Sequence, residues 1–198
     1  MEKVSYRKLR TGYFPNGEKK YDIYSLGDQK LLSTSYYESG QTFAEIFWKF
    51  DEKDFNLDNL LSSWITGIIS SYTLLKKYEI YIHGNVAFWY SNGQLFHENN
   101  FINGISDGAQ IWYRENGNKD YEGFYKNGLK HGMFTVYLDN GKVDFETKVE
   151  NGIDLWHKAY WRSNGKLMLE DEYFDGKLFK NTSWYESCLL YTSDAADE

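Results

Sequence analysis

Asparagine–glycine and aspartate–glycine pairs recur through the second half of this chain at a fixed spacing. From Gly93 to Gly176 the glycines of these pairs are separated alternately by 11 and by 13 residues, which defines a period of 24 residues with two turns in each. The pairs are Asn92-Gly93, Asn103-Gly104, Asn116-Gly117, Asn127-Gly128, Asn140-Gly141, Asn151-Gly152, Asn164-Gly165 and Asp175-Gly176. A fixed period between about 20 and 50 residues is typical of repeat proteins, in which one supersecondary unit is copied along the chain.

Each pair predicts a tight reversal of the chain. Asparagine, aspartate and glycine accept a positive φ, and two consecutive residues with positive φ form the type I′ turn that joins antiparallel strands. The intervening segments are rich in aromatic and β-branched residues, which favour strands. Because no long crossover connection is visible, the sequence predicts an all-β fold, a single-layer antiparallel β-meander of hairpin repeats. The structural turn residues that recur once per repeat are Gly93, Gly117, Gly141 and Gly165.

Side chains at fixed distances from these four glycines form two rows. Four positions before each glycine stands an aromatic residue, and five positions after it stands a glutamate. The aromatic row is Trp89, Tyr113, Tyr137 and Trp161, and the acidic row is Glu98, Glu122, Glu146 and Glu170. Because side chains alternate between the faces of a strand, both rows are predicted to lie on one face of the sheet.

The opposite face is predicted to be the drier one. In a short hairpin the residue five before the glycine pairs with the residue four after it. The predicted pairs are Phe88 with His97, Trp112 with Tyr121, Val136 with Phe145, and Tyr160 with Leu169. Cross-strand aromatic pairs of this kind contribute about 0.2–1 kcal/mol each.

The repeat array extends beyond its clearest part. An aromatic residue also stands four positions before Gly17 and Gly40, and Asp22 and Glu45 stand five positions after them. The predicted organisation is an N-terminal segment at 1–10 and an array at 11–187, degenerate at 51–82 and clear at 85–183, followed by a tail at 188–198.

Two stretches depart from the repeat. Over 51–82 the leucines have helical spacing, but Gly67 and its β-branched neighbours favour strands, so a degenerate repeat is preferred over a helix. The tail from Cys188 to Glu198 has no turn signal and is similar to a translated sequencing adapter, so we expect these residues to belong to no fold. The natural protein is then expected to continue beyond Ser187, and the array could be a spacer fused to a further domain.

Composition narrows the classes of function. The net charge of −7 argues against a nucleic-acid partner, since phosphate binding depends on basic residues. One cysteine permits no internal disulfide, which favours a reducing, cytoplasmic location. No secretory signal and no run of 18 apolar residues is present, and the lysine pairs are too sparse for a polybasic membrane patch.

One unit resembles a MORN repeat through its Tyr-x-Gly, Asn-Gly and His-Gly elements. Its sequence is Tyr121-Glu122-Gly123-Phe124-Tyr125-Lys126-Asn127-Gly128-Leu129-Lys130-His131-Gly132. The recurring Asn-Gly-x-Leu-x-x-Glu, as in Asn164-Gly165-Lys166-Leu167-Met168-Leu169-Glu170, is similar to the MORN-variant repeats of bacterial YwqK-family proteins, antitoxins of toxin–antitoxin systems. The resemblance implies protein binding, scaffolding or contact with lipid headgroups. Two departures stand out: the middle Tyr-x-Gly survives only at Gly123, and Trp156 replaces the glycine found at Gly108 and Gly132.

The acidic row has two interpretations. Equivalent glutamates two strands apart are separated by about 9.5 Å, which is too far for a retaining glycosidase and barely within the inverting range. The structural interpretation pairs each glutamate with a lysine or tyrosine on the same face. The functional one makes the row a strip that binds cations or a basic peptide. The aromatic row likewise either stiffens the sheet or serves as a recognition surface.

Histidines and glycines give no catalytic pattern. His83, His97, His131 and His157 are not spaced as a metal set, and His83 and His131 are expected to serve in turns. The glycines precede strands rather than helices, so no phosphate loop is predicted. We therefore expect no metal, no cofactor and no enzymatic activity.

The sequence favours a protein-binding module without catalytic activity, antitoxin-like, that docks a protein partner on the face carrying the aromatic and acidic rows. By resemblance that partner is a toxin with a basic face. One alternative is a MORN-type scaffold or membrane-peripheral protein that binds headgroups, and another is a hydrolase that uses two of the glutamates. The sequence does not specify an oligomeric state.

Overall fold

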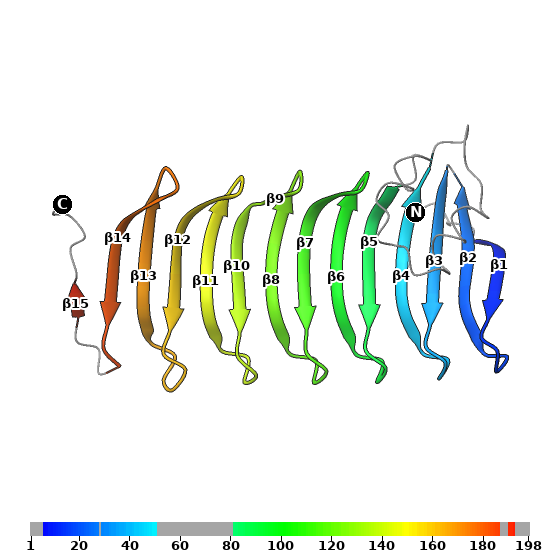
Figure 1. Cartoon of the computed structure of the whole chain (residues 1–198), viewed down its shortest axis with the longest axis horizontal. Coiled ribbons are helices and arrows are strands. Elements are labelled where there is room, and N and C mark those ends of the chain that lie inside the picture. Colours follow the sequence, from blue (N-terminus) through cyan, green and yellow to red (C-terminus); the bar gives the residue numbers. More distant parts are fainter. Residues whose placement is uncertain (1–5, 28, 51–80, 187–189, 193–198) are drawn as a thin grey trace. The chain divides into compact units, whose positions relative to one another are not determined.

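The computed structural model describes residues 6–27, 29–50, 81–186 and 190–192. These residues form strands joined by turns, and no helix occurs among them (Figure 1). The chain divides into two compact units, Met1–Gly93 with Asn100–Ile105, and Gln94–Asn99 with Ser106–Glu198. Strand order in the sheet follows chain order, except that β10 pairs with β8 and the short β9 pairs only with β8. This confirms the predicted single-layer antiparallel meander.

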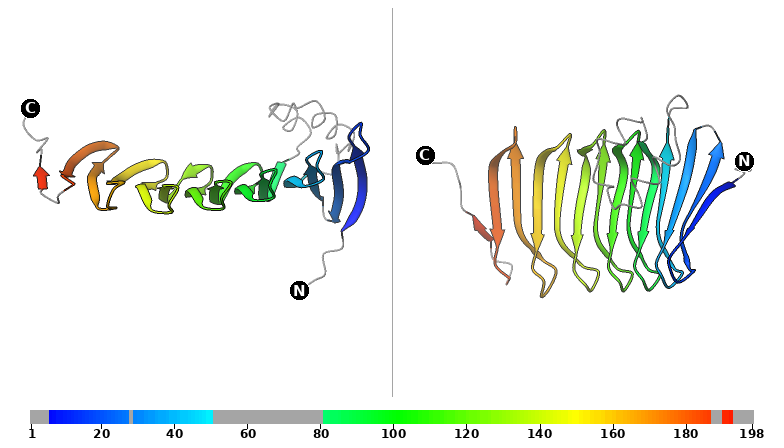
Figure 2. Two further views of the ribbon diagram at one scale, coloured as in Figure 1. Left: turned by 90° about the horizontal axis from the view of Figure 1, so that it is seen from below. Right: turned by 45° about the vertical axis from the view of Figure 1, so that its right-hand side comes forward.

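The first unit contains the strands β1 (Arg7–Tyr13), β2 (Lys19–Gly27), β3 (Lys30–Tyr36), β4 (Thr42–Lys49) and β5 (Tyr81–Trp89). Strand β6 (Leu95–Ile102) is divided between the two units. The second unit contains β7 (Ile105–Tyr113), β8 (Lys119–Lys126), β9 (Leu129–Lys130), β10 (Gly132–Tyr137), β11 (Val143–Glu150), β12 (Ile153–Tyr160), β13 (Leu167–Phe174), β14 (Lys177–Trp184) and β15 (Leu190–Thr192). Figure 2 shows the strands from β7 to β14 as one layer.

The turns at the two ends of the strands are of different types. Asn103, Asn127, Asn151 and Asp175 have φ near +50°, and each is followed by a glycine that also has positive φ, as a type I′ turn requires. At Gly93, Gly117, Gly141 and Gly165 only the glycine has positive φ. In the turn of Gly117 its amide donates to the Arg114 carbonyl, and the Arg114 amide donates to Asn118. The prediction of type I′ turns was therefore right for one end of the strands. It was wrong for the other, where a type I turn is followed by a bulge glycine at Gly93, Gly117 and Gly141, and a turn one residue longer precedes Gly165.

The cross-strand pairs predicted for the second unit are confirmed, with one exception. Cross-strand partners form the continuous row Trp112, Tyr121, Val136, Phe145, Ala159 and Leu169. Leu169 thus pairs with Ala159, and Tyr160 pairs with Leu167, so the predicted pair of Tyr160 with Leu169 was wrong.

The first unit has its own apolar core on one face of its strands. Its buried members are Tyr21, Ile23, Leu31, Ile46, Trp48 and Val86. The one polar group of Trp48 is satisfied there, since its Nε1 donates to the Ser33 hydroxyl at 2.7 Å, and that hydroxyl donates to the Ile46 carbonyl. Burial of polar groups is tolerated when they are hydrogen-bonded in this way.

The alternatives at 51–82 concern residues that, except for Tyr81 and Ile82, lie outside the described part of the chain. In the tail, Leu190–Thr192 pairs with β14 as the short edge strand β15. These three residues therefore differ from the expectation that the tail belongs to no fold. The outer edge of β14 leaves backbone donors and acceptors open, which an extended segment can pair with.

Candidate functional site

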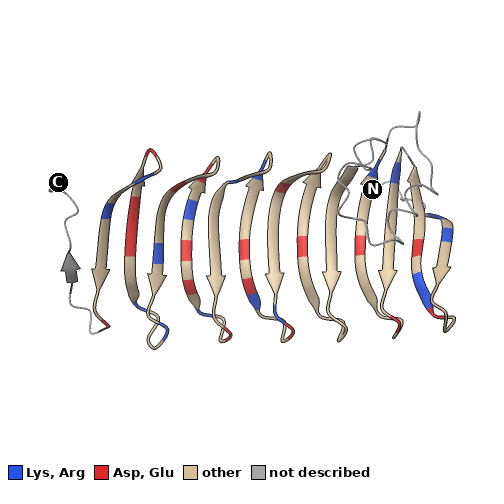
Figure 3. Cartoon of the chain, in the orientation of Figure 1, with Lys and Arg blue, Asp and Glu red and all other residues tan. Residues whose placement is uncertain are grey.

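A row of glutamates crosses the second unit on one face. Glu98 lies on β6, and Glu122, Glu146 and Glu170 lie on β8, β11 and β13 (Figure 3). In the sheet, one other strand lies between the strands of successive glutamates. The pairing register connects Glu122, Glu146 and Glu170 through Thr135 and Lys158 on the intervening strands. We call the four glutamates the carboxylate row and the face that bears them the carboxylate face.

Tyrosine hydroxyls link this row from hairpin to hairpin. Tyr113 donates to Glu98 at 2.9 Å, Tyr137 donates to Glu122, and Tyr160 donates to Glu146 at 2.6 Å. In each case the tyrosine belongs to the strand that follows the glutamate's hairpin, so the bond ties one repeat to the preceding one.

The first unit contains a bond of the same kind. Tyr36 donates to the carboxylate of Asp22 at 3.1 Å, and Lys8, Thr11 and Tyr24 donate to the same carboxylate. Asp22 is 1% exposed, the most buried acid of the described chain. Two separate parts of the chain thus use a tyrosine to hold an acid of the previous hairpin.

Titration behaviour follows from this geometry. Burial, together with the accepting carboxylate, raises the pKa of Tyr113, Tyr137 and Tyr160 to about 12. Burial opposes ionisation of Glu122, but hydrogen bonds from Lys119 and Tyr137 outweigh it and lower its pKa. A general acid needs a raised pKa, so Glu122 has the opposite character from the acid of a glycosidase.

Lysines neutralise part of the row. Lys119 pairs with Glu122, and Lys158 pairs with Glu170 at 3.0 Å. With the tyrosine bonds, each of the four glutamates has a lysine or tyrosine partner on its own face. These are the pairings that the structural interpretation of the acidic row predicts, and they leave its role in binding a prediction.

The aromatic row differs from its predicted membership at Trp161. The residue that donates to Glu146 is Tyr160, while Trp161 lies in the following turn, where its amide donates to the Lys166 carbonyl. The reason lies upstream. Gly108 and Gly132 have φ of +126° and +89°, a region that Trp156 does not occupy. Because a residue with a Cβ rarely adopts such a φ, β12 reaches its tyrosine one residue earlier, and the turn before Gly165 is one residue longer.

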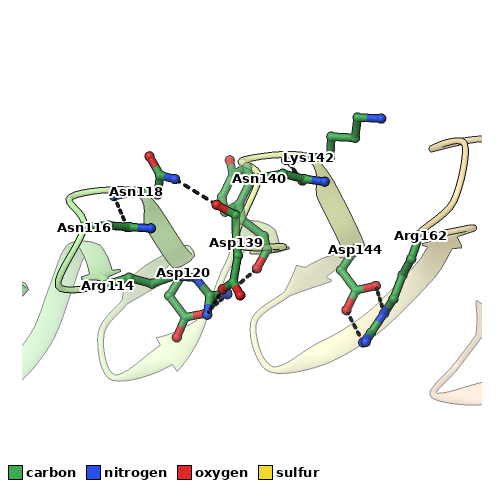
Figure 4. Close-up of polar contacts among 10 residues, drawn as sticks. Arg114, Asn116, Asn118, Asp120, Asp139, Asn140, Lys142, Asp144 and Arg162 are labelled. Carbon is green, nitrogen blue, oxygen red and sulfur yellow. Dashed lines mark hydrogen bonds and ion pairs between the residues drawn. The ribbon is translucent and has the colours of Figure 1, made fainter.

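Polar contacts also join the turns of neighbouring hairpins (Figure 4). The Arg114 guanidinium pairs with Asp120 of its own hairpin and with Asp139 of the next turn, the latter at 2.8 Å. Arg162 binds both carboxylate oxygens of Asp144, at 2.8 and 3.1 Å. Such pairs are exposed, so each contributes little, about 0.2–1 kcal/mol, and mainly fixes the spacing of the turns.

The opposite face of the second unit is aromatic. Phe134, which is 2% exposed, lies over Gly123 between the rings of Tyr121 and Tyr125, at centroid distances of 6.0 and 5.6 Å. An ideal Cβ on Gly123 would stand 2.2 Å from two atoms of the Phe134 ring. Sequence reasoning noted the Tyr-x-Gly element but missed the phenylalanine that it accommodates, and the signal was this lone glycine inside a predicted strand.

The histidines serve separate local roles. The Asn103 amide donates to Nδ1 of His83 at 3.3 Å, and the backbone amide of His131 donates to the Phe124 carbonyl. His97 stacks on Trp112 at 4.1 Å, and burial lowers its pKa. His157 contacts Phe145 and Tyr173.

Within the described residues, no group of three or more histidine, cysteine or acidic side chains could hold a metal ion. A search of the same residues found no helix long and apolar enough to cross a membrane.

Among solved structures, a mutant of TarM from S. aureus in complex with Fondaparinux, alpha-GlcNAc-glycerol and UDP aligns with 13% identity and a TM-score of 0.33. Another structure of TarM aligns with 14% identity and a TM-score of 0.32. Each alignment covers 65% of this chain and only 25% of the TarM chain. At these TM-scores the likeness supports no functional conclusion.

No curated protein matches this chain. The family model of the MORN repeat variant matches twice, over residues 82–103 and 106–127, and the two matches begin 24 residues apart, one period of the repeat. The resemblance to MORN repeats is confirmed for these two units, and the resemblance to YwqK-family antitoxins stays a prediction. Two consecutive hairpin units of this chain are thus similar to the MORN repeat variant.

Proposed function

We propose that this protein is a repeat scaffold without catalytic activity that docks a basic protein partner on its carboxylate face. MORN-variant repeats and a sheet of consecutive hairpins support the scaffold. The observation that carries the docking surface is the carboxylate row itself, in which tyrosine hydroxyls hold Glu98, Glu122 and Glu146 in register. In an interface, fixed acceptors need little reorganisation when a partner's cations approach.

The partner's chemistry follows from charge. The chain carries 29 acidic and 22 basic residues, and the carboxylate face offers ionised acceptors at regular intervals. Complementary charge speeds association and suppresses wrong partners more than it adds affinity. Tyrosines 113, 137 and 160 supply the aromatic area that interfaces favour. A toxin with a basic face, held in the cytoplasm, is the partner that the antitoxin resemblance suggests.

The carboxylate face can be tested by capture followed by reconstitution. A photo-crosslinking amino acid placed at the partly exposed Lys158, between Glu146 and Glu170, should trap the partner in lysate of the source cells, and mass spectrometry identifies it. The purified partner is then titrated calorimetrically against the wild-type chain and against Glu98→Gln/Glu122→Gln/Glu146→Gln. We expect the triple variant to bind at least about tenfold more weakly, a loss of about 1.4 kcal/mol. Glutamine keeps an oxygen that accepts from tyrosine, so the sheet should stay folded.

A matched control removes the same number of charges elsewhere. Glu38, Glu115 and Asp175 are exposed and lie in turns, outside the carboxylate row. The triple variant Glu38→Gln/Glu115→Gln/Asp175→Asn should bind the captured partner as the wild type does. Equal binding by both triple variants would show that the carboxylate face is not the docking surface.

The alternative, a scaffold that binds anionic headgroups, is distinguished by flotation with vesicles of phosphatidylserine and phosphatidylcholine. A face with ionised glutamates should be repelled by such vesicles, so the wild-type chain should stay in the bottom fraction. Salt-sensitive flotation would favour the headgroup-binding alternative and count against a basic protein partner.

A further inference from the structure

The acids of the repeat differ in what holds them. Asp22, Glu98, Glu122 and Glu146 each accept a tyrosine hydroxyl. Glu170 lacks such a bond but pairs with Lys158 at 3.0 Å. Glu45 is different: no hydrogen bond or ion pair joins its carboxylate to any other described residue.

The reason is a substitution in the repeat. Glu45 on β4 pairs with Ala87 on β5, as Glu122 pairs with Thr135. Two residues beyond Ala87, where the repeat places Tyr137, stands Trp89. An indole brings a broad aromatic surface and no hydroxyl, so the carboxylate of Glu45 keeps its accepting capacity.

A hollow is open beside this carboxylate. Its volume is 310 Å³, and Gln41, Thr42, Glu45, Trp89 and Gly93 line it. Gly93 has φ of +85° and no atom within 4 Å of its Cβ position, so this rim of the hollow is unobstructed. The Tyr37 hydroxyl donates to the Trp89 carbonyl at 2.9 Å, which fixes the backbone that carries the indole. The volume is at the lower end of the range of small-ligand sites, about 300–1,000 Å³.

An aromatic face together with an unpaired carboxylate is the combination that receives a guanidinium. Arginine stacks on aromatic rings and offers two parallel N–H donors to a carboxylate, whereas lysine presents a single hydrated charge. We propose that the hollow between Trp89 and Glu45 is a specificity pocket for one arginine side chain of the protein partner. This inference rests on the proposed function, because the arginine belongs to the proposed protein partner. It adds that the first unit recognises an arginine side chain of that partner.

A second hollow lies at the equivalent position of a later repeat and differs from the first in the partners of its carboxylate. It lies in the second unit, has a volume of 490 Å³, and is lined by Glu146, Tyr160 and Lys142 among others. There the carboxylate already accepts the Tyr160 hydroxyl, and a lysine stands at the rim. The row still attracts cations by its charge, but a guanidinium cannot use both oxygens of this carboxylate, because Tyr160 already occupies Oε2 of Glu146. The control for Glu45→Gln is Glu115→Gln, at an exposed turn acid outside the carboxylate row.

The probe is N-acetyl-arginine amide, titrated into the full-length ¹⁵N-labelled chain. The signals followed are the Trp89 indole N–H, assigned by its loss in Trp89→Leu, and the Gly93 amide. We expect saturable shifts with a dissociation constant on the order of millimolar, since a single exposed cation–π and ion pair is weak. The neutral isostere N-acetyl-citrulline amide should leave both signals in place, and N-acetyl-lysine amide should bind at least about threefold more weakly.

The variants decide the outcome. Glu45→Gln should weaken the arginine probe at least about fivefold. It removes no internal contact, so its spectrum should otherwise match the wild type. Trp89→Leu should abolish the shift at Gly93, and Glu115→Gln should leave the wild-type response unchanged. No saturable shift, equal shifts with citrulline, or an undiminished response in Glu45→Gln would each overturn the pocket.

Failure of the pocket is distinguishable from failure of the docking surface. If the arginine probe binds but the triple variant of the carboxylate row keeps its affinity for the captured partner, the pocket stands and the proposed docking face does not. If the partner binding depends on the carboxylate row while the probe gives no shift in the first unit, the docking face stands and the pocket does not.

Discussion

Replacement of Gly123 by alanine tests whether the aromatic face is built around a missing side chain. The new Cβ would stand 2.2 Å from Cδ1 and Cε1 of Phe134, whereas carbon atoms attract best at about 3.5–4.0 Å. The backbone itself would accept alanine, because Gly123 does not have a positive φ. On backbone grounds alone, alanine in a strand is favoured over glycine by about 0.5–1 kcal/mol. A loss of stability would therefore come from the contact with Phe134.

The magnitude follows from how little the ring can move. Phe134 is 2% exposed and flanked by Tyr121 and Tyr125, and Lys130 lies over its face at 5.2 Å. Overpacking a well-filled site costs about 1–3 kcal/mol, and expelling the ring instead forfeits about 1.5–3 kcal/mol of burial. After the backbone gain is subtracted, we expect Gly123→Ala to lower the free energy of unfolding by about 1–2 kcal/mol.

Hydrogen exchange measured by mass spectrometry is the appropriate assay, because repeats unfold locally and a single global midpoint can hide the change. Peptides covering β8 and β10 should lose protection, while those covering β2 and β3 should not. A double-mutant cycle provides the control. Phe134→Ala alone should cost about 3–5 kcal/mol, and in that background Gly123→Ala should be neutral or stabilising. Equal destabilisation by Gly123→Ala in both backgrounds would refute the reasoning.

Three further predictions concern other parts of the sheet. Burial disfavours the charge on Asp22, but hydrogen bonds from its donors outweigh this and lower its pKa from 3.8 to about 2. The ionised carboxylate therefore contributes about 2 kcal/mol to folding stability above pH 4, and this contribution is lost as the pH falls through 2. Acid unfolding that is equally steep in Asp22→Asn would contradict this. Tyr160→Phe removes the donor to Glu146 and should lower stability by about 1 kcal/mol, whereas Trp161→Phe should have a smaller effect on exchange in β11. Asn127 has φ of +52°, so Asn127→Ala should cost about 1–2 kcal/mol in urea unfolding and Asn127→Gly should be neutral; a costly glycine would show that the asparagine side chain, not its φ, matters.

The fold was predictable because one spacing fixes both the strand lengths and the positions of the turns. An Asn-Gly pair every 11 or 13 residues leaves room only for short antiparallel strands, and the two faces follow from alternation. The type of turn was harder to predict. Asn127-Gly128 and Asn116-Gly117 read alike, yet only Asn127 has a positive φ. The difference lies in how many residues the turn encloses, which depends on the pairing of the flanking strands.

The candidate site was predictable as a pattern and less so as a set of contacts. Counting four residues back from Gly165 selects Trp161, because counting assumes turns of equal length. The visible warning was Trp156, which replaces a bulge glycine and shifts β12 by one residue. Counting residues does not show that Tyr160 donates to Glu146 of the preceding hairpin. These two residues are brought together by the pairing register of the strands, which the spacing of the glycines does not give.

The longer turn before Gly165 has a consequence for how such arrays diversify. One rim of the ribbon has already accepted an additional residue while the neighbouring strands kept their alignment beyond it. In the second unit the opposite rim consists of two-residue reversals, where an added residue must be absorbed by a bulge if the following side chains are to keep their surface. Within that unit, insertions, tags and grafted loops should therefore be tolerated best along the border that carries Gly165, and a library built there would vary recognition without disturbing the scaffold.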